Sequence, residues 1–333
     1  MRSSTSSSRN PAPAGRWGLT WAVTLAAVVA TGALLESQAR RLGVTPSWSS
    51  GLESWCVEAS SLGPRDIAII GTSRALSGIE PGELSRGTGR GVRQLSINAT
   101  SMLPALEWLA SREDFSGVVL ADVIPGLEFR AGFERHAIAQ RVVQDLPDFT
   151  RSPARRLDAL LTRQVQTRLA FRSPGFHLLA PYRDRGGRGV GRLSRMTVEA
   201  SRFVRLEFRP EDPDAPESGP ETVSAPHAGE SEREQLFGRF ETAIRAIESR
   251  GGRVVLLFMP LSGRPARVEE LGFPRAKYWD RLGISTNALK IHFRDVPSLA
   301  GFTCADGEHL DGVEAVRFTR TLAGLLSREK IPH

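Results

Sequence analysis

The segment Asp66–Arg74, with the sequence DIAIIGTSR, decides the fold expected for this chain. Its apolar run is short and stops at a glycine, which is typical of a strand buried on both faces of a parallel sheet. Four more apolar runs follow along the chain, at residues 93–97, 117–122, 253–260 and 288–293. Helical segments lie among them, so the sequence predicts an α/β fold in which helices cover both faces of a mostly parallel sheet.

Three segments carry the helical signals of this fold. Residues 103–110 are the first, and Ser231 is placed to cap a second helix over residues 232–249. The last helix is expected over residues 313–326. Four of its apolar residues are predicted to face the core: Val313, Val316, Leu322 and Leu326.

Residues 130–208 interrupt the alternation of strands and helices. They are rich in arginine and helical in pattern, and we expect one apolar stripe among them to pack as core: Leu157, Leu160, Leu161 and Val165. Residues 209–231 are rich in proline, glutamate and serine, which predicts a disordered loop. The region 130–208 is therefore interpreted as a helical insertion within a domain that spans residues 65–330.

The N-terminal residues predict attachment to a membrane. Residues 1–16 are basic and contain no acidic residue, and residues 17–35 are uncharged and long enough to span a bilayer once. Basic residues before the span favour an N-terminal tail in the cytoplasm. A cleaved signal peptide is the alternative. Residues 36–64 are then a linker, and the main domain is expected outside the cytoplasmic membrane, in the periplasm.

Charge and cysteine content restrict the partners. The formal net charge of +7 comes from arginines spread along the chain, without a lysine-rich tail or zinc-finger spacing, so no nucleic-acid partner is expected. Cys56 and Cys304 are too few for a disulfide framework or a metal cluster, although one bridge between them stays open.

Polar segments follow several of the expected strands and should meet at one edge of the sheet. Ser73 follows the first strand, Asn98 the second and Asp122 the third, and the segment ADGEHLDG at residues 305–312 precedes the last helix. A serine hydroxyl becomes a nucleophile when a base takes its proton. We expect His309 to be that base and Asp306 to orient it.

Each of these residues has an alternative interpretation. Ser73 is also placed to cap a helix, and the segment 305–312 is also a polar turn in which Asp311 caps the last helix. Arg74 is either an anion binder beside the nucleophile or one partner of a surface salt bridge. A calcium or manganese site is the third alternative, with four ligands: Asp306, Glu308, His309 and Asp311.

The segments Gly71–Arg74 and Asp306–Leu310 resemble the first and last sequence blocks of the SGNH, or GDSL-like, hydrolase superfamily. The likeness is closest to its membrane-anchored bacterial branch, which includes relatives that act in O-acylation of cell-surface polysaccharides. The resemblance implies a three-layer α/β/α sandwich with a flavodoxin-like sheet. It also implies that Ser73 is the nucleophile and that Asp306 and His309 are its catalytic partners.

Two positions depart from the family pattern. The second block usually offers a glycine N–H to the oxyanion, whereas this chain has Asn98-Ala99-Thr100-Ser101, so we expect the Thr100 backbone or the Asn98 amide to donate instead. The third block usually supplies an asparagine, whereas Asp122 stands here, and an ionised carboxylate cannot donate a hydrogen bond. An aspartate at position 122 indicates either a different geometry of the oxyanion site or a weakened or lost activity.

The expected function is a serine acyl-ester hydrolase or O-acyltransferase that acts outside the cytoplasm on acylated envelope glycans or another ester, without a cofactor or metal. The first alternative is a catalytically silent domain of the same fold that binds polysaccharide or scaffolds envelope proteins. The second is a metal-dependent binding module built on the segment 305–312.

Overall fold

The computed structural model describes residues 17–130, 134–174, 176, 196–208 and 228–329. Its centre is a sheet of five parallel strands in the order β2-β1-β3-β6-β7. The strands are β1 (Ile67–Ile70), β2 (Val92–Gln94), β3 (Val118–Asp122), β6 (Arg253–Phe258) and β7 (Leu289–His292). Numbered among themselves, these strands have the order 2-1-3-4-5, which is the flavodoxin-like arrangement. The predicted α/β fold is confirmed.

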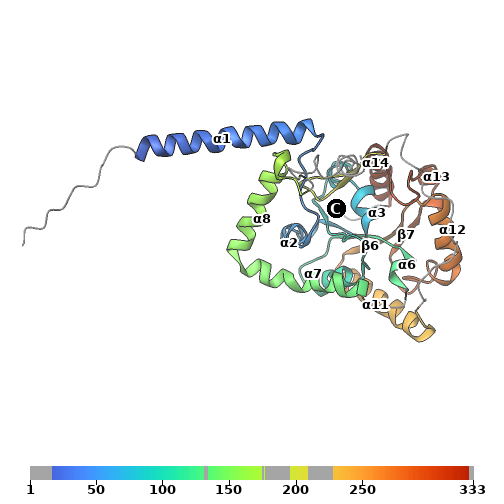
Figure 1. Cartoon of the computed structure of the whole chain (residues 1–333). Coiled ribbons are helices and arrows are strands. Elements are labelled where there is room, and N and C mark those ends of the chain that lie inside the picture. The colour runs from blue at the N-terminus through green and yellow to red at the C-terminus, as the bar shows by residue number, and fades with distance from the viewer. Residues whose placement is uncertain (1–16, 131–133, 175, 177–195, 209–227, 330–333) are drawn as a thin grey trace, which may run out of the picture.

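Helices cover both faces of this sheet (Figure 1), which explains why its inner strands are apolar except for Asp122 at the end of β3 and Arg253 at the start of β6. On one face α14 (Gly312–Arg328) packs against α3 (Ser73–Gly78) and α4 (Pro81–Thr88). On the other face α5 (Leu103–Ser111) packs against α11 (Glu230–Glu248) and α7 (Glu134–Arg151). All residues of β1 and β3 are buried between these two layers.

Two details of the expected helices are wrong. Val313 is 66% exposed, because nine positions separate it from Leu322 and two and a half helical turns place the two side chains on opposite faces. The buried face of α14 includes Phe318, Leu322 and Leu326. Ser231 does not cap α11, because that helix already begins at Glu230 and Gly229 is its N-cap.

The segment 36–64, expected to be a linker, is part of the packed core. It contains the helix α2 (Leu52–Ser60), and both Trp48 and Trp55 are buried. The Trp55 indole donates a hydrogen bond to the carbonyl of Leu95, 2.8 Å away, just beyond β2. Cys56 and Cys304 are both buried and unbridged.

Among the described residues of the insertion, helices come first and a hairpin comes last. After α7 come α8 (Pro153–Gln166) and a 3-10 turn, η1 (Ala170–Arg172), and then an antiparallel hairpin of β4 (Met196–Val198) and β5 (Val204–Leu206). Arg202 in the hairpin turn is buried with a φ of 64°. Its guanidinium donates to the carbonyls of Gln94 and Ser96, which ties the hairpin to the sheet.

The expected core stripe of α8 faces outward instead. Its four residues are between 37% and 59% exposed: Leu157, Leu160, Leu161 and Val165. The opposite face of α8 carries Arg155 and Arg163, and it is this polar face that turns toward the protein. Arg155 pairs with Glu53 and Asp145, and Arg163 with Glu58 of α2. These acids select which face of α8 packs inward.

The helix α1 (Trp17–Arg41) leaves the domain as a long projection (Figure 1). Among the described residues it is the one helix long and apolar enough to cross a membrane, and either a signal sequence or an anchor has that character. Its C-terminal part contacts η1, where the Glu36 carboxylate accepts the backbone N–H of Phe171 at 3.2 Å. The expected cytoplasmic tail, 1–16, and residues 209–227 of the expected loop lie outside the described residues.

The remaining described elements follow β3 or come between β6 and α14 along the chain. After β3 comes α6 (Pro125–Glu128), and between β6 and α14 come α12 (Gly263–Gly272), η2 (Arg275–Lys277), η3 (Phe293–Asp295) and α13 (Pro297–Ala300).

Candidate active site

Ser73 lies just beyond the carboxyl end of β1, at the point where the strand order of the sheet reverses. Gly71 makes the turn there with a φ of 144°, and a Cβ on it would lie 2.7 Å from the Cβ of Asp122. Thr72 is the N-cap of α3, since its hydroxyl accepts the backbone N–H of Arg74 at 3.4 Å. Ser73 is therefore the first residue of the helix and not its cap, which leaves its hydroxyl available to another partner.

That partner is His309. Its Nε2 atom lies 2.9 Å from the Ser73 Oγ, and its Nδ1 atom lies 2.7 Å from Oδ2 of Asp306. A carboxylate beside Nδ1 favours the tautomer in which Nδ1 carries the proton. In that tautomer Nε2 accepts the hydrogen bond of the Ser73 hydroxyl, so the imidazole is placed to take the serine proton.

Asp306 is held in its ionised form by the turn around it. Burial opposes ionisation, but the hydrogen bond and charge of His309 and the backbone N–H groups of Glu308 and His309 outweigh it, so the pKa of Asp306 is lowered. Those two N–H groups lie 2.9 and 2.7 Å from Oδ1 of Asp306. The carboxylate is thereby fixed against the imidazole and able to stabilise its protonated form.

The segment 305–312 therefore divides its acids among different tasks. Asp311 is the N-cap of α14, as the sequence predicts, and accepts the backbone N–H of Val313 at 2.9 Å. It also accepts the N–H of Phe208 at 3.2 Å, a contact with the insertion. Glu308 is exposed at the pocket edge. In the described part of the chain, no group of three or more His, Cys, Asp or Glu side chains is placed to hold a metal ion.

The loop after β2 brings Ala99, and not the two expected residues, to the pocket. Asn98 is exposed and is not among the lining residues, and Thr100 is buried with its hydroxyl donating to the carbonyl of Ile97 at 3.0 Å. Ala99 lines the pocket together with Ser73 and has a φ of 56°. Glycine adopts this left-handed conformation without steric penalty, whereas alanine does not.

Glu128 holds the end of this loop. Its buried carboxylate accepts the backbone N–H of Met102 at 3.0 Å and the hydroxyl of Ser101. Burial raises the pKa of Glu128 to about 7, although both hydrogen bonds act in the other direction. No signal in the sequence distinguished this glutamate from a surface residue just before the insertion.

Asp122 and Arg74 form a buried pair behind the serine. Arg74 is only 3% exposed; its Nη2 atom lies 3.6 Å from Oδ1 of Asp122 and donates to the carbonyl of Val123 at 3.0 Å. Its guanidinium also lies over the ring of Phe258. Burial raises the pKa of Asp122, and the charge of Arg74 opposes that shift. Arg74 thus forms a buried ion pair and not a surface salt bridge, and it still lines the pocket beside Ser73, whereas the Asp122 carboxylate does not reach the pocket surface.

The pocket beside Ser73 has a volume of about 290 Å³. One part of its wall is apolar and comes from the segments after β3 and β6, which include α6 and α12: Ile124, Leu127, Leu261, Pro265 and Val268. Another part is lined by the charged side chains of Arg74, Arg130, Glu269 and Glu308. Sequence reasoning missed Arg130, Glu269 and the apolar wall, although the position of these segments after strand ends was an available signal.

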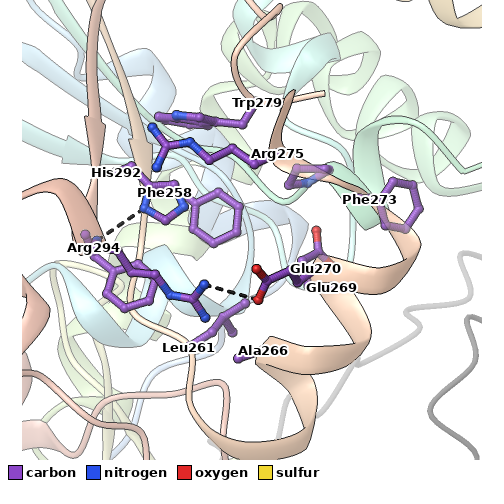
Figure 2. A pocket seen from close by; sticks show the side chains of 12 residues that line it. Phe258, Leu261, Ala266, Glu269, Glu270, Phe273, Arg275, Trp279, His292 and Arg294 are labelled. Atoms are coloured by element: carbon purple, nitrogen blue, oxygen red, sulfur yellow. Dashed lines mark hydrogen bonds and ion pairs between the residues drawn. The ribbon is translucent and has the colours of Figure 1, made fainter. Parts of the chain in front are cut away.

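A second pocket, of about 70 Å³, lies on the β7 side of the first and shares Leu261 and Glu269 with it (Figure 2). Aromatic rings form its walls, including Phe258, Trp279 and His292. Burial lowers the pKa of His292 to about 4, so this ring is neutral and stacks on Phe258 at 4.5 Å between centroids.

A scan against protein-family models and a search of the curated proteins both found no match to this chain. The assignment of chemistry to the site therefore rests on its geometry.

Proposed function

We propose that this protein is a serine acyl-ester hydrolase or O-acyltransferase that acts on envelope glycans outside the cytoplasm. The observation that carries the proposal is the hydrogen-bonded series Ser73–His309–Asp306 at the edge of a pocket. This is the arrangement that makes a serine hydroxyl nucleophilic: a base accepts its proton, and a fixed carboxylate orients the base and stabilises its charge.

The reaction has two steps. In the first step Ser73 Oγ attacks the ester carbonyl while His309 accepts the hydroxyl proton. His309 then gives that proton to the departing alcohol oxygen, and the acyl group remains bound to Ser73. In the second step His309 takes a proton from water or from a sugar hydroxyl as that oxygen attacks the acyl carbon; the bond to Ser73 Oγ breaks, and His309 returns the proton to Ser73. Hydrolysis and transfer differ only in the second acceptor.

The tetrahedral intermediates need donors for their negative oxygen. The backbone N–H of Ser73 has no partner four residues earlier within α3, because Ser73 is the first residue of that helix. Ala99 lines the same pocket, and the backbone of its loop is the second source of donors in this proposal. The buried position of Asp122 means that the third strand supplies no side-chain donor, so the backbone carries this task.

The composition of the pocket supports an ester that joins an apolar acyl group to a polar alcohol. The apolar wall, which includes Ile124, Leu127 and Val268, suits a short acyl chain. The charged part, with Arg130 and Glu308, suits the hydroxyls of a glycan. The apolar helix α1 supports retention at the cytoplasmic membrane as a single-pass anchor, with the domain in the periplasm.

The experiment compares the release of acetate from an acetylated oligosaccharide by the full-length protein and two serine variants. Ser73→Ala should reduce hydrolysis by roughly 10³-fold or more. Ser77→Ala is the matched control, because Ser77 lies one turn later on α3 and its hydroxyl only donates to the carbonyl of Ser73. Release that is equal in all three proteins, or present in none, would remove the enzymatic proposal, and the second result would favour a silent glycan-binding domain.

A further inference from the structure

The exposed face of α8 is an apolar surface on an otherwise polar part of the molecule. Leu157, Leu160, Leu161 and Val165 are at helical spacing and make one stripe, which we call the α8 stripe. Exposed Arg156 lies along one side of this stripe and exposed Asp158 along the other, and exposed Arg168 follows the C-terminal end of the helix. An exposed apolar stripe with arginines beside it and at its end is a feature of helices that lie in the interface of an anionic bilayer.

Polar contacts on the other face of α8 decide which face of the helix packs against the domain. Arg155 donates to Glu53 and Asp145 at 2.7 and 2.6 Å, and the guanidinium of Arg163 lies 3.6 Å from Glu58. Charged side chains normally face water and leucines face the core, and here the two are reversed. Water alone does not favour an apolar stripe of four residues on the outward face of a polar helix.

The position of α8 brings this stripe to the end of the domain from which α1 leaves. The chain runs from α8 directly into η1, and η1 contacts the C-terminal part of α1, where Phe171 donates to Glu36. In Figure 1 α8 runs crosswise to α1 along the edge of the domain on the side toward which α1 projects. If α1 crosses a bilayer, α8 lies along the surface of that bilayer.

We infer that the α8 stripe is a membrane-contacting surface that rests in the headgroup region of an anionic bilayer. This inference depends on the proposal that α1 is a membrane anchor. Exposed Arg41 at the end of α1 and exposed Arg172 in η1 add positive charge near α8, whereas Arg40 is paired with Glu36. Lipid phosphates complement this charge. The contact holds the domain in one orientation on the membrane.

The test uses the full chain in vesicles of phosphatidylcholine and phosphatidylglycerol, with a bimane fluorophore on one introduced cysteine. Leu161→Cys reports on the α8 stripe, and Ala26→Cys reports on α1. Leu271→Cys is the matched control, because Leu271 is 65% exposed, against 55% for Leu161, and lies on α12 at the far side of the domain (Figure 1). The native cysteines are buried. Lipids that carry a nitroxide near the headgroup quench a label at that depth, and lipids that carry a nitroxide deep in the acyl chain quench a label at Ala26→Cys in the centre of the span.

We expect nitroxide lipids to lower the fluorescence at Leu161→Cys at least about twofold, because interfacial helices enter the headgroup boundary, and to leave Leu271→Cys unchanged. Quenching at Ala26→Cys without quenching at Leu161→Cys would overturn the inference and leave the anchor intact. Quenching at neither position would reject the anchor itself. A label at Leu161→Cys that both nitroxide lipid and aqueous iodide fail to reach would mean that a second copy or another protein covers the stripe, which also overturns the inference.

Discussion

The Nε2 atom of His309 lies 2.9 Å from the Oγ atom of Ser73, although 236 positions separate the two residues in the chain. The parallel sheet makes this contact, because the turn after β1 and the turn before α14 both lie at its carboxyl edge. The expectations for catalysis follow from this contact and from the groups that hold its two partners.

Replacing Asp306 with asparagine should remove the orientation of His309. The amide offers no charge to stabilise the imidazolium and favours the wrong tautomer, so we expect kcat/KM for ester hydrolysis to fall by roughly 10²–10⁴-fold. The measurement is steady-state hydrolysis of an activated acetyl ester by purified full-length protein.

Asp122→Asn is the matched control for that variant. Asp122 has the same side chain but is buried behind Arg74 and does not line the pocket, so kcat/KM should change by less than about tenfold. A loss in Asp122→Asn as large as that in Asp306→Asn would mean that the buried acid takes part in the reaction.

Ala99→Gly should leave activity intact and not weaken the fold. The left-handed φ of 56° costs alanine roughly 1–2 kcal/mol. Glycine removes that cost but makes the unfolded chain more flexible by about 0.4–1 kcal/mol, so the free energy of unfolding should rise slightly or stay equal. Thermal and urea unfolding measure this.

A β-branched residue at the same position should have the opposite effect. Ala99→Val forces a branched side chain into the left-handed region, which costs of the order of 1–3 kcal/mol, and displaces the loop that borders Ser73. We expect lower stability together with lower kcat. Equal activity in Ala99→Gly and Ala99→Val would argue that this loop takes no part in the reaction.

Glu128 should make stability depend on pH between 4.5 and 7. Its pKa is raised from 4.5 to about 7 in the folded protein, so the folded state binds the proton more tightly than the unfolded state. The resulting stabilisation is complete below pH 4.5 and is lost as the pH rises to 7, by about 3 kcal/mol.

The variant Glu128→Gln isolates this contribution. The amide keeps an acceptor for the N–H of Met102 and carries no charge at any pH. Relative to the wild type it should become progressively more stable from pH 4.5 to 7, as measured by denaturant unfolding at each pH. A difference between the two proteins that is constant with pH would show that Glu128 does not titrate in this range.

The parallel sheet and the three central residues of the site could be predicted from the sequence for a physical reason. A strand buried on both faces must be apolar, and ligands gather beyond the carboxyl ends of such strands. Those two rules were enough to bring Ser73 together with the turn that contains Asp306 and His309.

The remaining features depend on contacts that a local pattern does not contain. The face that α8 turns inward was decided by Glu53 and Glu58, acids on a helix about a hundred residues earlier. Arg202 holds its hairpin through carbonyls at the end of β2, and Glu128 holds the end of the loop that contains Ala99. Apolar periodicity identifies a helix and its two faces, but the partner decides which face is buried.

The most direct test of the central claim is covalent labelling of the full-length protein with a fluorophosphonate probe, followed by mapping of the labelled peptide. We expect one adduct, on Ser73, that is abolished in Ser73→Ala, strongly slowed in His309→Ala because the base is missing, and unchanged in Ser77→Ala. Absence of label on the wild type, or a label on Ser73→Ala equal to that on the wild type, would contradict the role of Ser73 as a nucleophile.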